Sequence, residues 1–176
     1  MSLVVIGARG EPDGPQVTSG GERPGLPTVT LRKVVEEDLE IFHRHQSDPV
    51  SIEMARVRPR DKAAYLARWR QFLQDDSFGK RTVLAGGEVA GQVISFDRDG
   101  VRELGYWIGR EFWGQGIAGT AVRQYLGMEL HRPLFAIVAE HNEASRRILA
   151  RCGFLEESRK GDALHYQLSA RQTDQH

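Results

Sequence analysis

The most constraining feature of this sequence is a glycine-rich corner between a short apolar segment and a helical one. Residues 104–108, Leu-Gly-Tyr-Trp-Ile, have the composition of a buried strand. The corner follows at residues 113–118, Trp-Gly-Gln-Gly-Ile-Ala, and apolar residues then recur at helical spacing as far as Leu130. A strand that turns through glycines into a helix exposes a row of backbone N–H groups, which suits a phosphate. We therefore expect this corner to bind a phosphate-bearing ligand.

The rest of the sequence predicts strands and helices arranged around this corner. Strands are expected at 28–33, 81–85, 88–97, 134–138, 154–159 and 163–168, and helices at 35–46, 61–74, 116–130 and 143–152. Residues 50–60 are expected to be irregular, because Asp48-Pro49 should end the preceding helix. The strand at 134–138 follows a helix and should therefore pair in parallel with the strand at 104–108. This pattern predicts an α+β fold: a mixed, mostly antiparallel twisted sheet with one central β-α-β crossover, flanked by helices.

The composition limits the classes of protein that fit. The 176 residues include 24 Lys and Arg and 24 Asp and Glu, so no net charge favours nucleic acid or an acidic membrane surface as a partner. The single Cys152 excludes an internal disulfide and a cysteine-based metal site, and fits a reducing cytosol. The apolar run at residues 3–6 is too short to span a membrane. We expect a soluble, cytoplasmic protein with no metal.

One folded domain is expected, with a short segment on each side of it. Gly and Pro are concentrated in residues 1–27, which should form a flexible arm. Residues 28–169 should form the domain, and residues 170–176 a polar tail. A homodimer through the helix at 61–74 or the hairpin at 154–168 is compatible with the pattern, although no residue requires it.

A second segment gives the glycine corner a more specific meaning. Asn142-x-x-Ser145 opens the last helix, which ends at Cys152-Gly153-Phe154. Together with the corner, it makes the chain resemble the GNAT superfamily of N-acetyltransferases, whose signature is Arg/Gln-x-x-Gly-x-Gly/Ala. Trp113 stands at the first position of that signature in place of Arg or Gln. The sequence Gly-Tyr-Trp-Ile…Phe-Trp-Gly-Gln-Gly-Ile-Ala is nevertheless similar to the RimJ/RimL branch. Members of that branch acetylate N-terminal amines of ribosomal proteins, or other amines. The resemblance covers roughly residues 28–168.

The resemblance implies the acyl-CoA N-acyltransferase fold, with acetyl-CoA as co-substrate. The backbone amides that would hold its pyrophosphate belong to Gly114, Gln115, Gly116, Ile117, Ala118 and Gly119. The strand edge at Tyr106, Trp107 and Ile108 would pair with the pantetheine arm, and the Ile108 amide would polarise the thioester carbonyl. Asn142 would contact the same arm, or serve only as a helix N-cap. In the family the strands equivalent to 104–108 and 134–138 diverge, which leaves those amides free.

An amine acceptor must lose a proton before it attacks a thioester, so a general base is needed. Glu103 is the best-placed candidate, because it lies on the central strand five residues before Ile108. Strand alternation puts Glu103 and Trp107 on one face, and Tyr106 and Ile108 on the other. The alternative is that Glu103 is a surface carboxylate at the end of a strand.

The leaving thiolate also needs a proton. Many members of the superfamily supply it from a Tyr seven residues past the Asn, but that position is Leu149 here. Ser145 is the remaining candidate, with a first-turn serine that caps backbone groups as the alternative. Cys152 lies on an apolar helix stripe, which favours a place in the core over a role as an acyl-carrying nucleophile.

Three histidines and three arginines have weaker claims on the site. His43, His45 and His141 are candidate bases, but each is expected to be a surface or capping residue. The loop that by resemblance lines the acceptor site contains Arg56, Arg58 and Arg60. We expect these three arginines to be solvated surface charges. The more specific alternative is that they recognise an acidic acceptor.

The leading hypothesis from the sequence is an enzyme that moves an acetyl group from acetyl-CoA to a primary amine. The acceptor would be a protein N-terminus or a small molecule, attacking directly in a ternary complex. A non-catalytic acyl-CoA-binding sensor module on the same fold is the alternative, since Leu149 replaces the usual acid.

Overall fold

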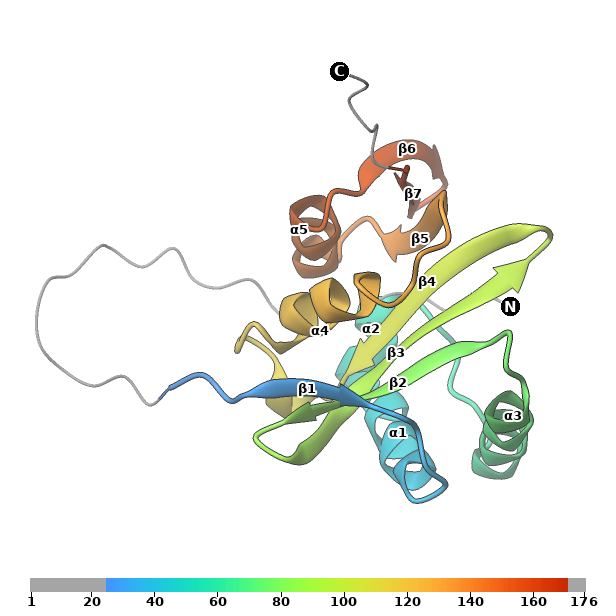
Figure 1. Cartoon of the computed structure of the whole chain (residues 1–176), viewed down its shortest axis with the longest axis vertical. Helices are drawn as coiled ribbons and strands as arrows, with labels where there is room; N and C mark the ends of the chain where they lie inside the picture. Colours follow the sequence, from blue (N-terminus) through green and yellow to red (C-terminus); the bar gives the residue numbers. More distant parts are fainter. Residues whose placement is uncertain (1–24, 171–176) are drawn as a thin grey trace, which may run out of the picture.

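A computed structural model describes residues 25–170, which form one seven-stranded sheet with helices on both faces (Figure 1). The strands are β1 (Val29–Arg32), β2 (Gly79–Ala85), β3 (Glu88–Arg98), β4 (Val101–Ile108), β5 (Leu134–Ala139), β6 (Leu155–Lys160) and β7 (Ala163–Leu168). The helices are α1 (Asp38–Gln46), α2 (Pro49–Ala55), α3 (Lys62–Gln74), α4 (Ile117–Leu126) and α5 (Glu143–Arg151), with a 3-10 turn, η1, at Arg110–Phe112.

The order of the strands across the sheet is β1-β2-β3-β4-β5-β7-β6. Strands β1 to β4 are antiparallel neighbours, β5 pairs in parallel with β4 across the crossover helix α4, and β7 and β6 complete the sheet in antiparallel pairing. In Figure 1, β5 to β7 and α5 lie on one side of β4, and β1 to β3 lie on the other. The predicted α+β fold with one central β-α-β crossover is confirmed.

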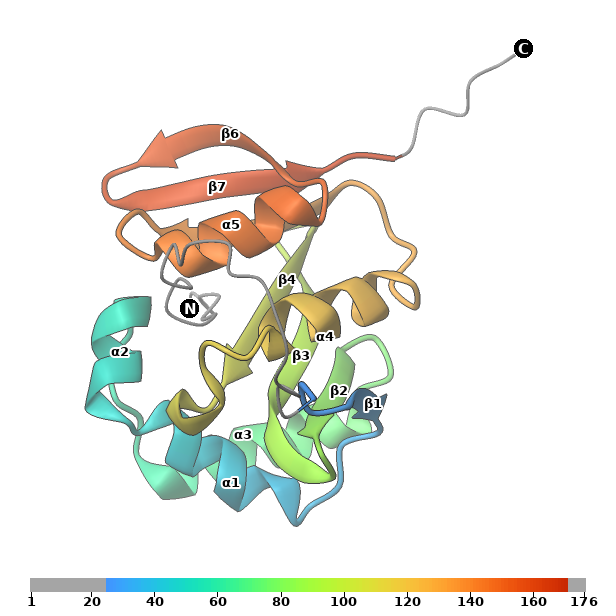
Figure 2. The same ribbon diagram turned by 90° about the vertical axis from the view of Figure 1, so that its left-hand side faces the viewer.

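Two apolar cores hold the helices against the two faces of the sheet. On one face, α4 and α5 pack on alternate β4 residues, including Leu104 and Tyr106. On the other face, α1 and α3 contribute Phe42 and Trp69 to a cluster with Ile94 of β3. Figure 2 views the first face, with α4 lying across the strands. The alternation along β4 therefore decides which residues face each helical layer.

Helix α2 corrects the prediction that residues 50–60 are irregular. Asp48 is its N-cap, with a side chain that accepts a hydrogen bond from the Ser51 amide (3.0 Å), and Pro49 occupies the first turn. Proline ends a preceding helix but is also favoured at the start of a new one. Helix α1 likewise begins later than expected, at Asp38, whose side chain accepts from the Val35 amide (3.0 Å).

The crossover helix ends four residues earlier than predicted, at Leu126. The chain turns after Gly127, and the amides of Met128 and Glu129 both donate to the Tyr125 carbonyl. Glu129 then points inward while Leu130 is 78% exposed. The prediction of a longer helix counted Leu130 as an inward-facing apolar residue, whereas the structure exposes it to solvent.

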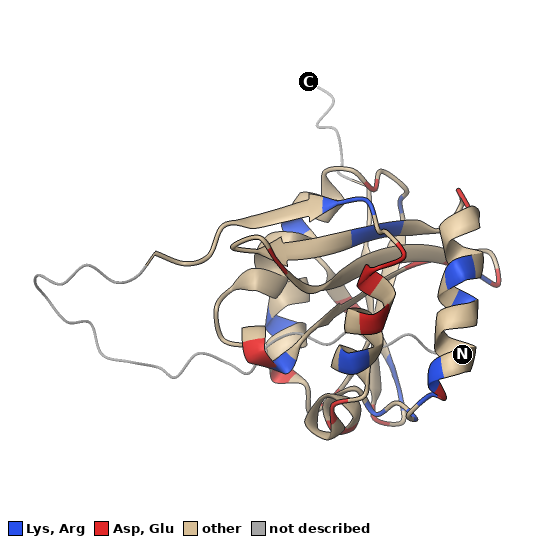
Figure 3. Ribbon diagram, turned by 90° about the horizontal axis from the view of Figure 1, so that it is seen from below, with Lys and Arg blue, Asp and Glu red and all other residues tan. Residues whose placement is uncertain are grey.

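Basic and acidic side chains alternate on the face of the described residues seen from below in Figure 3. The edge strand β6 is exposed along its whole length and carries Glu156, Glu157, Arg159 and Lys160. Charged residues on an edge strand oppose unwanted pairing with another sheet.

Candidate functional site

The glycine corner forms an open and uncapped helix N-terminus. Gly114 and Gly116 have φ angles of 75° and 71°, a conformation that favours glycine. A β-carbon added at either position would meet no atom within 4 Å, so both glycines border open space. Among the residues that the structure describes, no side chain caps the first turn of α4. The first amides of α4, from Ile117 to Gly119, therefore have the arrangement in which helix N-termini attract anions.

Strand β4 presents two backbone amides beside this corner. The Gly109 amide donates to the Ala90 carbonyl (2.8 Å), so alternate amides along β4 face β3 and those of Tyr106 and Ile108 face the other way. Within residues 25–170, the register of β4 with β5 consists of a single pair, Glu103 with Phe135. The two strands therefore part before Tyr106, and the divergence that the family resemblance implies is present.

Glu103 lies at the point where β4 and β5 still pair, and it is not a surface residue. It is 8% exposed, and its cross-strand neighbour is Phe96, which packs against the core of α1 and α3. The Arg98 Nη2 atom lies 3.0 Å from the Glu103 carboxylate, without regular hydrogen-bond geometry. Burial raises the pKa of the Glu103 carboxyl, and the charges of Arg98 and His165 only partly oppose this. The alternative of an exposed strand-end carboxylate is wrong.

Asn142 and Ser145 are both fully buried at the start of α5. Asn142 is the N-cap, and its Oδ1 atom accepts from the Ser145 amide (3.1 Å). The cap therefore uses the backbone of Ser145 and not its hydroxyl. The Ser145 side chain lies near the hydroxyl of Tyr106. Burial raises the pKa of Tyr106, and the Ser145 hydroxyl opposes that rise. Geometrically regular hydrogen bonds to this tyrosine hydroxyl are absent from residues 25–170.

The side chain of Tyr106 was missed by sequence reasoning, which gave this residue only a backbone role. It faces α5 because β4 alternates, and its hydroxyl therefore lies beside the serine that the sequence had singled out. The signal was available in the period-two pattern of β4 combined with the position of Ser145 in the first turn of α5. A buried hydroxyl without a regular partner is uncommon, and it adds a second candidate proton donor.

His45 was predicted to be a surface or capping residue, and the structure buries it. It is 3% exposed, its Nε2 atom lies 3.2 Å from Glu111, and burial lowers the pKa of its imidazole. The Trp107 indole donates to the His45 carbonyl (3.1 Å), which fixes the end of α1 beneath β4. His43 instead bonds Ser47, and His141 is exposed, as expected.

The remaining sequence candidates divide into core and surface residues. Leu149 is fully buried in the core. Cys152 packs against the same core, and burial raises the pKa of its thiol, as expected of a structural cysteine. Arg56, at the end of α2, forms an ion pair with Asp162 in the β6–β7 turn (3.1 Å). Both side chains of this pair are largely exposed.

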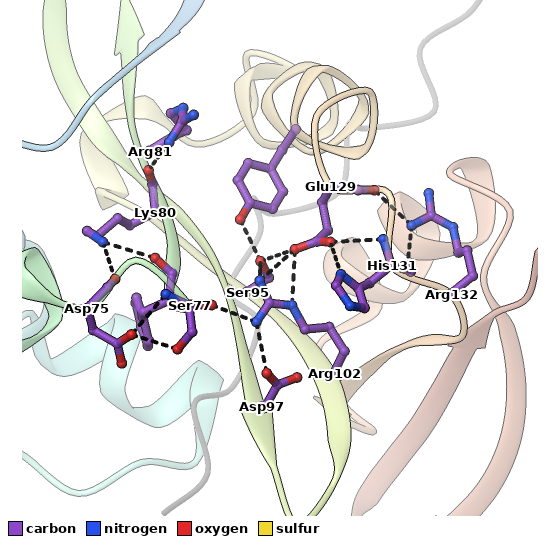
Figure 4. Close-up of polar contacts among 12 residues, drawn as sticks. Asp75, Ser77, Lys80, Arg81, Ser95, Asp97, Arg102, Glu129, His131 and Arg132 are labelled. Carbon is purple, nitrogen blue, oxygen red and sulfur yellow. Dashed lines mark hydrogen bonds and ion pairs between the residues drawn. The ribbon is translucent and has the colours of Figure 1, made fainter.

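A second buried carboxylate, Glu129, lies on the opposite face of the sheet from Glu103, in a complete polar network (Figure 4). It accepts from Ser95, from Arg102 Nη2 (2.9 Å) and from the His131 amide (3.0 Å), and Ser95 also contacts the Tyr125 hydroxyl (2.7 Å). Burial alone would raise the pKa of Glu129, but these hydrogen bonds and the Arg102 charge together lower it. This network joins α4 to β3 and β4.

Two kinds of feature are absent from residues 25–170. These residues contain no group of three or more His, Cys, Asp or Glu side chains arranged to hold a metal ion. None of the helices between β1 and β7 is long and apolar enough to cross a membrane.

The fold and this site define the acyl-CoA N-acyltransferase class: a mixed sheet whose central parallel strands diverge beside a glycine-rich helix N-terminus. Residues 28–155 match the acetyltransferase (GNAT) domain family, which covers most of the chain. The protein therefore belongs to the GNAT acetyltransferase family, and the family predicted from the sequence is confirmed.

Individual relatives agree with this assignment. The chain is 36% identical over 104 residues to the "Putative ribosomal N-acetyltransferase YdaF" of Bacillus subtilis (strain 168), a match that spans 55% of this chain and 57% of the relative. Among solved structures, spermidine N-acetyltransferase from Vibrio cholerae in complex with CoA and spermine is 20% identical, with a TM-score of 0.70 over 80% of this chain and 95% of that one. Aminoglycoside acetyltransferase AAC(6')-Ib in complex with coenzyme A is also 20% identical, with a TM-score of 0.67 over 82% and 96%. At this identity the structures show the fold.

Proposed function

We propose that the protein is an acetyl-CoA-dependent N-acetyltransferase that acetylates a primary amine. The observation that carries this proposal is the opening between β4 and β5. There, the amides of Tyr106 and Ile108 face away from β3, beyond the single β4–β5 pair, and the Trp113 indole that donates to the Ile108 carbonyl connects this strand end to the glycine corner. An extended pantetheine arm would pair with such amides as an added strand does, and its pyrophosphate would bind the amides of residues 114–119. Asn142 would contact the same arm from the start of α5.

The proposed reaction is direct attack of the amine on the thioester. Glu103 accepts a proton from the amine, and its raised pKa makes it a stronger base than an ordinary carboxylate. The Ile108 amide stabilises the negative charge that develops on the carbonyl oxygen. The carbon–nitrogen bond forms, the carbon–sulfur bond breaks, and the thiolate leaves. Ser145, with the Tyr106 hydroxyl beside it, returns a proton to that thiolate.

Two classes of acceptor are supported by the relatives. The Bacillus subtilis relative is named as a ribosomal N-acetyltransferase, which supports a protein N-terminus as acceptor and the RimJ/RimL-like branch. The spermidine and aminoglycoside enzymes, which share the fold, act on small-molecule amines. An N-terminal amine has a pKa of about 8 and loses its proton more readily than an alkyl amine of about 10.4. A carboxylate base such as Glu103 is therefore better matched to the N-terminal class.

The test is a thiol-release assay with acetyl-CoA and a panel of amines and short peptides, with the acetylated product identified by mass. Release that depends on an acceptor supports the proposal. No release with any acceptor, combined with no binding of acetyl-CoA in calorimetry, would overturn it.

One observation favours the alternative of a non-catalytic acyl-CoA-binding sensor. Leu149 is completely buried at the position where the family resemblance implies a proton-donating Tyr in many members. The two functions separate in the same experiment. A sensor would bind acetyl-CoA in calorimetry without release of thiol, whereas the enzyme would do both.

A further inference from the structure

The imidazole of His45 is a buried titratable group that the proposed reaction does not use. It lies at the end of α1, where burial lowers the pKa of the ring and the nearby Glu111 charge only partly opposes this. A neutral imidazole has one N–H, and the Nε2 atom lies 3.2 Å from the Glu111 carboxylate, so we assign the proton to Nε2. The Nδ1 atom has no hydrogen-bond partner within residues 25–170. A buried ring nitrogen without a partner costs stability, so other contacts must hold the ring in this position.

The ring is packed against the segment that joins β4 to the glycine corner. A β-carbon added at Gly109 would lie only 2.6 Å from the His45 Nε2 atom, so the close approach of the ring requires glycine there. The Phe112 ring meets the imidazole edge-on, with centroids 6.2 Å apart. Between these two residues, Glu111 supplies the polar contact. In Figure 2, the chain between β4 and α4 accordingly passes beside the ends of α1 and α2.

The same segment is joined to the glycine corner by side-chain hydrogen bonds. The Gln115 side chain donates to the Glu111 carbonyl (3.3 Å), and the Trp113 indole donates to the Ile108 carbonyl (2.9 Å). Glu111 is therefore shared between two neighbours: its carboxylate meets His45, and its carbonyl accepts from Gln115. A continuous set of contacts runs from α1 through Glu111 to the corner.

A second link between the helices and this segment is weaker. The Arg110 Nε atom lies 3.3 Å from the carboxylate of Asp48, the N-cap of α2, and the Arg110 side chain is largely exposed. Ion pairs in solvent contribute little to stability. The buried imidazole of His45 is therefore the main support of this segment from the helical side.

We propose that His45 is a positioning residue for the coenzyme: through Glu111, it holds the glycine corner in the conformation whose amides receive the pyrophosphate. The inference rests on the proposed transferase function and deepens it by extending the coenzyme site to α1. Glu103 is not part of this set of contacts. Loss of the support should therefore weaken the binding of acetyl-CoA and leave kcat at saturating acetyl-CoA unchanged.

The first test is the affinity for acetyl-CoA, measured by calorimetry on the full chain. His45→Leu removes the donor and should weaken binding by about fivefold, the usual effect of losing one hydrogen bond. His45→Gln keeps a neutral N–H donor at a similar reach and should retain most of the affinity. Both variants keep the backbone carbonyl that accepts from the Trp107 indole. His43→Leu is the matched control, because His43 lies on the same helix but bonds Ser47 (3.3 Å), and it should leave the affinity unchanged.

A double-mutant cycle tests the contact itself. Glu111→Ala removes the carboxylate, which is 55% exposed, and keeps the carbonyl that Gln115 uses, so this variant should fold. Loss of a negative charge also favours an anionic ligand, but that effect is the same with and without His45 and cancels in the cycle. We expect Glu111→Ala to weaken acetyl-CoA binding about fivefold more in the wild-type chain than in His45→Leu. Additive effects of the two substitutions would overturn the inference.

Amide hydrogen exchange without ligand separates this inference from the proposed function. The amides of Phe112 and Trp113 close the η1 turn, and His45→Leu should speed their exchange while that of β2 and β3 stays unchanged. Unchanged acetyl-CoA affinity in His45→Leu, with thiol release intact, would overturn the inference and leave the transferase standing. Equally faster exchange throughout the sheet would also overturn it, since that marks a general structural role. Faster exchange confined to η1, in a chain that neither binds acetyl-CoA nor transfers its acetyl group, would overturn the proposed function and retain the support of the corner by His45.

Discussion

Glu103 and Glu129 are equally buried, at 8% exposure, yet their surroundings shift their acidities in opposite directions. Glu129 accepts hydrogen bonds from Ser95, Arg102 and the His131 amide, and its pKa is lowered. Glu103 has one cationic contact of irregular geometry, and burial raises its pKa. The difference lies in how completely each charge is compensated, because the two carboxylates have similar exposure.

This difference separates a structural carboxylate from a reactive one. A fully compensated buried charge fixes the chain around it, as Glu129 fixes the end of α4 against β3 and β4. An incompletely compensated buried charge binds a proton more strongly than an ordinary carboxylate does, which is the property a general base needs. Substitution of one carboxylate, or of one part of the site, should therefore show whether that group acts mainly on stability or on catalysis.

The largest expected effect is on turnover in Glu103→Gln. Removal of a general base lowers kcat by about 10²-fold to 10⁴-fold, whereas the affinity for acetyl-CoA should not change, because Glu103 faces away from the proposed coenzyme site. Thiol-release kinetics and calorimetry measure the two quantities. Glu157→Gln is the control, since Glu157 is exposed on the edge strand β6 and is not among the charges that shift the Glu103 pKa. Unchanged turnover in Glu103→Gln would assign the base elsewhere.

Glu129→Gln should act on stability and leave catalysis alone. Loss of the charge weakens the contacts to Ser95 and Arg102, and hydrogen bonds to charged groups contribute about 2 kcal/mol. Urea unfolding measures the free energy of unfolding, and kcat is measured at a temperature where both chains are folded. In the control Glu143→Gln, an exposed pair with Arg147 is lost, which should cost less than about 0.5 kcal/mol. A fall in kcat for folded Glu129→Gln would contradict the conclusion that Glu129 is a structural carboxylate and Glu103 the reactive one.

Gly116→Ala should weaken acetyl-CoA binding by about tenfold. Its positive φ makes a β-carbon cost about 1 kcal/mol, and that carbon would occupy the open space before the amides of α4. Gly161→Ala is a matched control, because Gly161 also has a positive φ (63°) and open space but lies in the β6–β7 turn. Both variants should lose similar stability. An equal acetyl-CoA affinity in both variants would argue against a pyrophosphate at the corner.

Ser145→Ala should lower kcat by less than about tenfold, because a thiol of pKa about 8.5 leaves readily without full protonation. The helix cap should survive, since Asn142 holds the Ser145 amide and not its hydroxyl. Tyr106→Phe, which removes only the neighbouring hydroxyl, is measured in parallel by the same kinetics. If Tyr106→Phe alone lowers kcat, the proton comes from the tyrosine, and the assignment of Ser145 as the acid is wrong.

The sequence predicted the parts of the molecule that depend on local chemistry. The corner was predictable because Gly114 and Gly116 are needed for a backbone that turns through positive φ. The alternation of β4 was predictable because the two faces of a strand have a strict period of two. These two features are the basis of the proposed coenzyme site, and the second puts Glu103 and Tyr106 on opposite faces.

The parts that escaped prediction depend on contacts between distant segments. Pro49 is compatible with both the end of one helix and the start of the next, and the Asp48 cap decided between them. The inward turn of Glu129 depends on Ser95 and Arg102, which lie about thirty residues earlier. His45 is buried because the loop with Glu111 covers it. No local sequence pattern predicts such contacts.

The smallest expected effect is a difference in how stability depends on pH. The folded pKa of Glu103 is raised above its ordinary value of 4.5, so its stabilising contribution is full below that value and is lost as pH rises through the raised pKa. Glu129 has a lowered folded pKa, so its contribution is present above 4.5 and is lost as pH falls. From about pH 4 to about pH 7, Glu103→Gln should therefore become more stable relative to the wild-type chain, and Glu129→Gln less stable. Urea unfolding of the three chains at both pH values measures this, and changes of the same sign in both variants would show that the two carboxylates are not differently compensated.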